Sequence, residues 1–221
     1  IGPGSGKAIV ALGVMNIALR RTTRVGFFRP IIGGTSTGRR DDDINLILRH
    51  FNLPQSYESA YVWHQHEVDE LLGADRLDEV IEKIIHAYKA LERECDFILI
   101  EGTDYQGQLS ALEFDLNCII ARNLGAAVLI VGNARDRTVR ESLNALHQSM
   151  DAYEEKGCVV VGVTLNQAHP EQVRELSVAL EDEFGQDGKL VGVFPFEPVL
   201  RSPSVREVAE QLGATVIFGA D

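Results

Sequence analysis

The sequence predicts an α/β fold, in which a single doubly wound, mostly parallel sheet is flanked by helices. Two observations support this class. Short apolar runs alternate repeatedly with amphipathic segments, and no internal repeat or low-complexity linker interrupts the alternation. A length of 221 residues suits one well-buried domain, which we expect to occupy residues 1–221.

The expected strands are short and continuously apolar, which is typical of parallel strands buried on both faces. Proline follows two of them, at Pro30 and Pro195, and cannot donate to a sheet ladder. We expect strands at 24–28, 96–100, 126–131, 158–165, 190–194 and 215–218.

The expected helices carry apolar residues at helical spacing between these strands. Thr138 and Glu141 form a plausible capping box at the start of one of them. Asp41-Asp42-Asp43 precedes another, where carboxylates either cap the helix or form part of a Mg²⁺ site. We expect helices at 7–21, 44–51, 67–72, 77–91, 114–123, 138–153, 170–184 and 203–212.

A glycine-rich turn, Gly2-Pro3-Gly4-Ser5-Gly6-Lys7, leads into the first helix. Glycines let backbone N–H groups converge on one point, and a helix start and a lysine add positive charge there. The pattern indicates a P-loop, with Gly4, Ser5, Gly6 and Lys7 binding phosphate. It departs from the usual motif at Ile1, where a glycine is expected, and at Ala8, which lacks the hydroxyl that holds Mg²⁺. The alternative is an ordinary turn that caps a helix.

Glu101 is the most informative carboxylate, because it follows an apolar strand at the point where α/β folds bind ligands. An unpaired buried charge is costly, so Glu101 needs a partner. We expect Lys7 and Glu101 to converge at one rim of the sheet. The other groups expected at the strand ends are Arg29, Gly132-Asn133, Asn166 and Pro195.

The composition limits the partners. A formal net charge of −12 argues against nucleic acid and anionic membranes. No apolar run reaches the length of a membrane span, and no signal peptide is recognisable. The three cysteines form no CxxC pair, so we expect buried, reduced thiols in a cytoplasmic protein.

An ordered set of segments across nearly the whole chain resembles the dethiobiotin-synthetase-like P-loop domain at the N-terminus of long bacterial phosphate acetyltransferases. The segments are Ser5-Gly6-Lys7, Phe28-Arg29-Pro30-Ile31, residues 38–54, Ile100-Glu101-Gly102, Val163-Thr164-Leu165-Asn166, residues 191–195 and residues 202–214. The resemblance implies an acidic, cytosolic P-loop NTPase-like domain. In the long proteins a separate C-terminal domain performs acetyl transfer, and we expect that domain to be absent here.

The resemblance also implies roles for individual residues. Lys7 would bind the phosphates of ATP, and Glu101 with either Asp42 or Asp43 would hold Mg²⁺. Asn166 and the loop at Pro195 would border the adenine. Arg29 stands where dethiobiotin synthetases have a substrate-contacting lysine, and arginine cannot deprotonate as a lysine can. No catalytic residue is assigned.

Three functions remain open at this point. The first is a regulatory or scaffolding domain with a weak nucleotide or anion site. The second is an ATP- and Mg²⁺-dependent ligase or synthetase that phosphorylates a carboxylate or carbamate. The third is a ligand-free module in a homo-oligomer, with apolar residues at an interface, although a buried core is the commoner explanation of such residues. The residues in question are Phe27, Phe28, Phe194, Phe196 and Phe218.

Overall fold

The computed structural model describes residues 6–33, 40–103, 110–198 and 213–214. The helices in this part are α1 Lys7–Leu19, α2 Asp42–His50, α3 Gln65–Gly73, α4 Leu77–Glu92, α5 Ser110–Asn123, α6 Val139–Glu155 and α7 Val173–Phe184. The strands are β1 Val25–Phe28, β2 Ile31–Ile32, β3 Trp63–His64, β4 Phe97–Ile100, β5 Ala127–Asn133, β6 Val159–Ala168 and β7 Leu190–Pro195. The expected helix at 203–212 and strand at 215–218 lie outside the described residues.

Every strand pairing in the described part is parallel, which confirms the predicted α/β class. Within the described residues the single sheet that we expected is not continuous, because the strands form three hydrogen-bonded groups: β1 with β4, β2 with β3, and β5 with β6 and β7. A P-loop motif has a strand directly before its loop. In this chain that strand would come before the glycine-rich turn, and residues 1–5 lie outside the described part.

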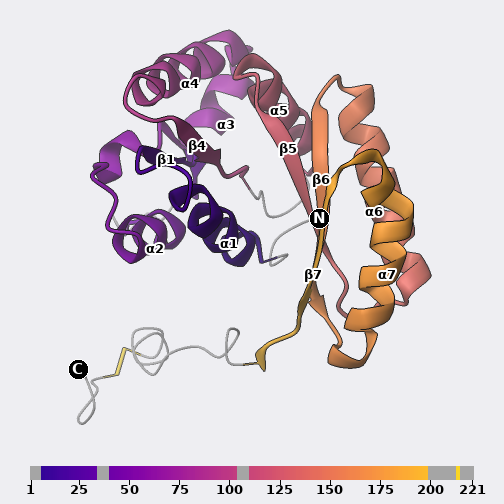
Figure 1. Cartoon of the computed structure of the whole chain (residues 1–221). Helices are drawn as coiled ribbons and strands as arrows, with labels where there is room; N and C mark the ends of the chain where they lie inside the picture. Colours follow the sequence, from indigo (N-terminus) through magenta and orange to yellow (C-terminus); the bar gives the residue numbers. More distant parts are fainter. Residues whose placement is uncertain (1–5, 34–39, 104–109, 199–212, 215–221) are drawn as a thin grey trace.

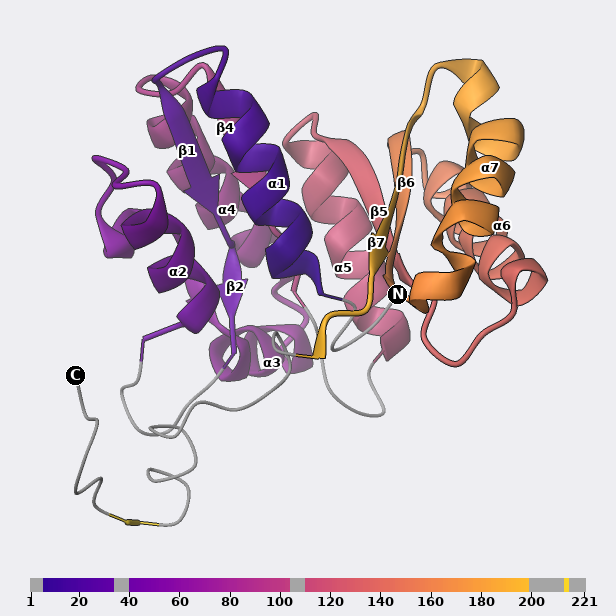
Figure 2. The ribbon, with the colours of Figure 1, turned by 60° about the horizontal axis from the view of Figure 1, so that its bottom comes forward.

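Helices cover both faces of the β1–β4 pair (Figures 1 and 2). Adjacent residues of β1 point to opposite faces. Phe27 belongs to a core with α1 and α2, whereas Phe28 belongs to a core with α4 and α5. Both phenylalanines are fully buried, so they serve the core and not an oligomer interface.

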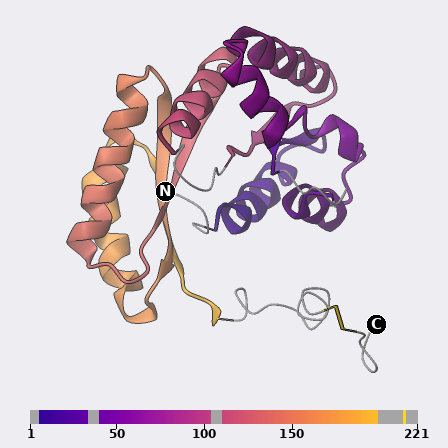
Figure 3. The ribbon, with the colours of Figure 1, turned by 180° about the vertical axis from the view of Figure 1, so that it is seen from behind.

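The second half of the chain is built around the β5–β6–β7 sheet. Helices α6 and α7 lie along one face of this sheet, as the view from behind shows (Figure 3). Leu146 of α6 and Leu180 of α7 are buried against Val163 and Leu165 of β6. The predicted capping box is present at the start of α6, where Thr138 and Glu141 bond to each other's backbone N–H.

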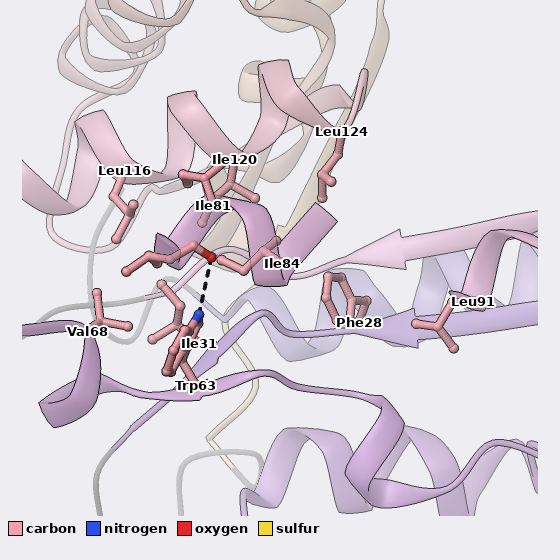
Figure 4. Close-up of a cluster of buried hydrophobic side chains, with 11 residues drawn as sticks. Phe28, Ile31, Trp63, Val68, Ile81, Ile84, Leu91, Leu116, Ile120 and Leu124 are labelled. Atoms are coloured by element: carbon pink, nitrogen blue, oxygen red, sulfur yellow. Dashed lines mark hydrogen bonds between the residues drawn. The ribbon is translucent and has the colours of Figure 1, made fainter. Parts of the chain in front are cut away.

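The short β2–β3 pair was not predicted, because two-residue strands show no periodicity. It is held by the surrounding core, in which the indole of Trp63 packs among aliphatic side chains (Figure 4). Trp63 Nε1 donates to the carbonyl of Val80 at 3.2 Å. Cys118 and Cys158 are buried free thiols, as expected, whereas the free thiol Cys95 is only half-buried. No described helix has the length and apolar character needed to cross a bilayer.

Replacing the buried Trp63 by phenylalanine should lower the free energy of unfolding by about 2 kcal/mol. The change removes the hydrogen bond to Val80 and leaves part of the indole volume empty. Urea denaturation followed by circular dichroism measures the loss. The exposed Val178 provides the control, because Val178→Ala should change stability by less than about 0.5 kcal/mol. Equal effects of the two substitutions would contradict the packing described here.

Candidate anion site at the strand ends

The start of α1 requires a glycine at position 6. Gly6 has φ +79° and ψ 35°, a left-handed conformation that costs other residues strain. Its Cα also lies against the amide of Asn166, and a Cβ at Gly6 would fall 1.9 Å from Asn166 Nδ2. Asn166 Nδ2 donates to the carbonyl of Gly6 at 3.4 Å. The last glycine of the predicted P-loop is therefore fixed by a buried residue of β6.

Lys7 turns back toward the end of β4. Its ammonium donates to the carbonyl of Gly102 at 2.8 Å, next to Glu101. The expected convergence of Lys7 and Glu101 is thus observed. The dipole at the start of α1 and this ammonium give the rim of the fold a positive character near residue 6.

Arg29 and Glu101 are neighbours because the strands that precede them are paired. In the β1–β4 ladder Phe28 lies opposite Ile100, and the N–H of Glu101 donates to the carbonyl of Phe28 at 2.9 Å. The next residue of β1, Arg29, brings its Nη1 to 3.1 Å from Glu101 Oε1. Both side chains are largely buried.

Two aspartates at the start of α2 complete this cluster. Arg29 Nη1 donates to Asp43 Oδ2 and lies 3.5 Å from Asp41 Oδ1. Asp41 also caps α2, because its side chain accepts from the N–H groups of Asp43 and Ile44. The capping interpretation of the aspartates is therefore confirmed for Asp41. The carboxylates of Asp41, Asp43 and Glu101 together face a single guanidinium.

Burial and charge oppose each other in this cluster. Burial raises the pKa of Glu101 to about 7, although Arg29 acts to lower it. Burial likewise raises the pKa of Asp41 against the attraction of Arg29. Burial of the Arg29 guanidinium works against its charge, but the carboxylates outweigh burial and raise its pKa. Arg29 is therefore permanently protonated here.

The two candidates for a metal-binding aspartate differ in their surroundings. Arg29 contacts both Asp43 and Glu101, whereas Asp42 is exposed on the first turn of α2. The described residues contain no group of three histidine, cysteine or acidic side chains placed to hold a metal ion. The carboxylates of Asp43 and Glu101 are directed at a guanidinium nitrogen, so this arrangement does not fit Mg²⁺.

Asn166 and Pro195 lie at neighbouring strand ends. Asn166 is buried in β6, and its amide contacts the loop at Gly6. Pro195 ends β7 and is exposed, and the N–H of Phe196 donates to Ala168 at 2.7 Å. Gly4 and Ser5, the other expected phosphate-binding residues, lie outside the described part.

Two residues that shape this rim were not predicted from the sequence. Asn117 of α5 holds the turn after β4, because its side chain accepts from the N–H of Thr103 and donates to the carbonyl of Thr103. Arg135 places its guanidinium 5.0 Å from the ring centre of Phe196. Neither pairing has a local sequence signal, since each joins separate elements.

Comparison with known proteins assigns a family. A model of the AAA domain family matches residues 1–204. The chain belongs to this family. It is 38% identical over 217 residues to phosphate acetyltransferase of Synechocystis sp., and 40% over 218 residues to that of Nitratidesulfovibrio vulgaris. The protein of the same name from Pseudomonas putida is 26% identical over 230 residues.

These alignments cover nearly all of this chain but about a third of the relatives. The shares are 98%, 97% and 99% of this chain against 31%, 31% and 32% of the respective relatives. The AAA domain of phosphate acetyltransferase-like proteins is thus the counterpart of this chain, which confirms the resemblance drawn from its motifs. The coverage is consistent with the N-terminal domain that the resemblance implied.

Gly6→Ala should destabilise the domain by about 2 kcal/mol, because alanine disfavours a positive φ and its methyl group would overlap Asn166. Gly13 in the same helix is the matched control. It is exposed and has open space where a Cβ would lie, so Gly13→Ala should stabilise by about 0.5–1 kcal/mol. Thermal unfolding of both variants measures these changes. If Gly6→Ala left the stability unchanged, the left-handed conformation assigned to Gly6 would be wrong.

The free energy of unfolding should contain a contribution from Glu101 that decreases as the pH rises. The folded protein binds this proton up to a pKa of about 7, whereas the unfolded chain releases it near 4.5, so deprotonation between these values favours unfolding. Glu101→Gln should remove that decrease in urea titrations across this range. Exposed Glu171 serves as the control, since Glu171→Gln should retain the wild-type profile. If the free energy of unfolding of Glu101→Gln decreased with pH as it does in the wild type, Glu101 would not be the source of the decrease.

Proposed function

We propose that this AAA domain is a regulatory or scaffolding unit of a phosphate acetyltransferase-type protein, with a weak site for a nucleotide or another polyphosphate anion. The observation that carries the proposal is the position of Lys7, whose ammonium lies 2.8 Å from the Gly102 carbonyl beside the start of α1. A helix N-terminus together with a lysine is suited to a phosphate chain.

The proposed contacts follow from the same rim. Gly4, Ser5, Gly6 and Lys7 would surround the phosphates, with Arg29 beyond them. Asn166 and the loop at Pro195 would border the adenine of an ATP molecule, and Asn166 would also support the loop at Gly6. The departures at Ile1 and Ala8 favour binding over turnover, because the loop is short and lacks the hydroxyl that holds Mg²⁺.

The whole protein around this domain is also part of the proposal. The relatives are about three times as long as the matched segment, so we propose a C-terminal acetyltransferase domain as the partner in a longer protein. We further propose that residues 1–221 fold as one domain, that the assembly is a homo-oligomer in the cytoplasm, and that its ligand is neither nucleic acid nor membrane, consistent with the net charge of −12.

An active synthetase is the second candidate. It is favoured by the proximity of Lys7, Asp43 and Glu101, which resembles the charged groups of an ATP site. In that case Arg29 would have to move away before Asp42 or Asp43 with Glu101 could hold Mg²⁺, and the substrate would be a carboxylate or carbamate. Robust ATP turnover that is lost in Lys7→Ala would favour this candidate and count against a purely regulatory domain.

Lys7→Met should weaken the binding of ATP, ADP and pyrophosphate at least about 10-fold, because one charge-assisted contact to phosphate is lost. Isothermal titration calorimetry measures the dissociation constants. The exposed Lys89, which pairs with Glu92 on α4, is the matched control, and Lys89→Met should bind as the wild type does.

A wild-type protein that binds none of these anions would overturn the polyphosphate site. Equal binding by the wild type and Lys7→Met would locate the ligand elsewhere on the molecule.

A further inference from the structure

We propose that Arg29 is a built-in counter-cation, whose guanidinium lies where a divalent ion would have to bridge Asp43 and Glu101, so that this domain takes its polyphosphate without a metal. Metal-free binding of a polyphosphate rests on the proposed function, whereas the role of Arg29 as a counter-cation rests on the geometry of the cluster alone.

The carboxylates of Asp41, Asp43 and Glu101 all lie against the guanidinium of Arg29. One nitrogen, Nη1, contacts an oxygen of Asp43, lies 3.1 Å from Glu101 Oε1 and lies 3.5 Å from Asp41 Oδ1. Magnesium needs carboxylate oxygens at about 2.1 Å in a nearly octahedral shell. An ion that bridged Asp43 and Glu101 through these oxygens would therefore have to displace the guanidinium.

The guanidinium is not easily displaced. Its side chain is only 12% exposed, and arginine keeps its charge at every physiological pH. Moving it away would leave a buried cation without its partners, which is one of the costly changes in a protein interior. A lysine at this position could lose its proton and make room for a metal, but arginine does not.

Two buried atoms of the cluster could each form a further hydrogen bond. Glu101 Oε2 and Arg29 Nε have no hydrogen-bond partner among the described residues. Nε is a donor that the carboxylates leave unused, but it is buried, so an oxyanion can reach it only if the surrounding residues shift. A phosphate oxygen that reached Nε would leave the contacts of Nη1 with the carboxylates in place.

Manganese binding tests the role of Arg29, since Mn²⁺ takes the same oxygen ligands as Mg²⁺ and is visible by electron paramagnetic resonance. The wild-type chain should show no saturable Mn²⁺ site that depends on Asp43. Arg29→Met removes the charge and should bind Mn²⁺ at least about 10-fold more tightly than the wild type. Adding Asp43→Asn to Arg29→Met should abolish the gain.

Arg24→Met is the matched control, because Arg24 precedes the same strand but is half exposed and pairs with Asp96 away from the cluster. It should not acquire a Mn²⁺ site. If Arg29→Met is unfolded without metal, Mn²⁺ should restore its thermal transition, and EDTA should remove it again.

The proposal is overturned by a wild-type Mn²⁺ site that is lost in Asp43→Asn, a measurement that does not depend on the stability of any Arg29 variant. It is also overturned if Arg29→Met gains no Mn²⁺ binding and no metal-dependent folding.

A second titration separates this inference from the proposed function. Wild-type affinity for ATP should agree within about 2-fold between Mg²⁺ and EDTA solutions, whereas a loss of about 10-fold or more in EDTA would contradict metal-free binding. Complete absence of ATP binding would refute the polyphosphate site and leave the manganese result to decide the role of Arg29.

Discussion

The buried pairing of Arg29 with three carboxylates is the constraint on which the N-terminal half of this structure depends. Charges inside a protein are costly unless they are paired, so β1, β4 and the start of α2 must meet in one arrangement. Parallel pairing of Phe28 with Ile100 places Arg29 beside Glu101, and the cap at Asp41 brings the first turn of α2 to the same nitrogen. The fold and the electrostatics of the rim are therefore determined together.

A second set of contacts joins groups of strands that share no ladder. Lys7 reaches the carbonyl after β4, and Asn166 of β6 reaches the carbonyl of Gly6. The beginning of α1 is thus tied to the β1–β4 pair and to the β5–β6–β7 sheet. A ligand that bound at Gly6 and Lys7 would contact the point where the two halves of the described structure are linked.

The sequence predicted these elements where local chemistry is decisive. Continuous apolar runs identified the parallel strands, and Thr138 with Glu141 identified the start of α6. The partners of Arg29 were not predictable, because the pairing of β1 with β4 joins segments about seventy residues apart. The contact of Asn166 with the loop at Gly6 was not predictable either, because it joins residues 160 positions apart in the chain. Local patterns thus indicated where the groups gather but not which of them bind one another.

The exchange of a metal for an arginine has a chemical consequence for the proposed regulatory role. Phosphoryl transfer needs positive charge that follows the charge developing on the phosphate, and a divalent ion bridging two phosphate groups supplies it. A guanidinium held by Asp41, Asp43 and Glu101 is fixed to the protein and shares its charge with them, so it favours binding over turnover. A ligand controls a distant domain only through different affinities for two conformations. A buried cluster that joins two strands and a helix is suited to that difference, because a change at Arg29 reaches all three elements.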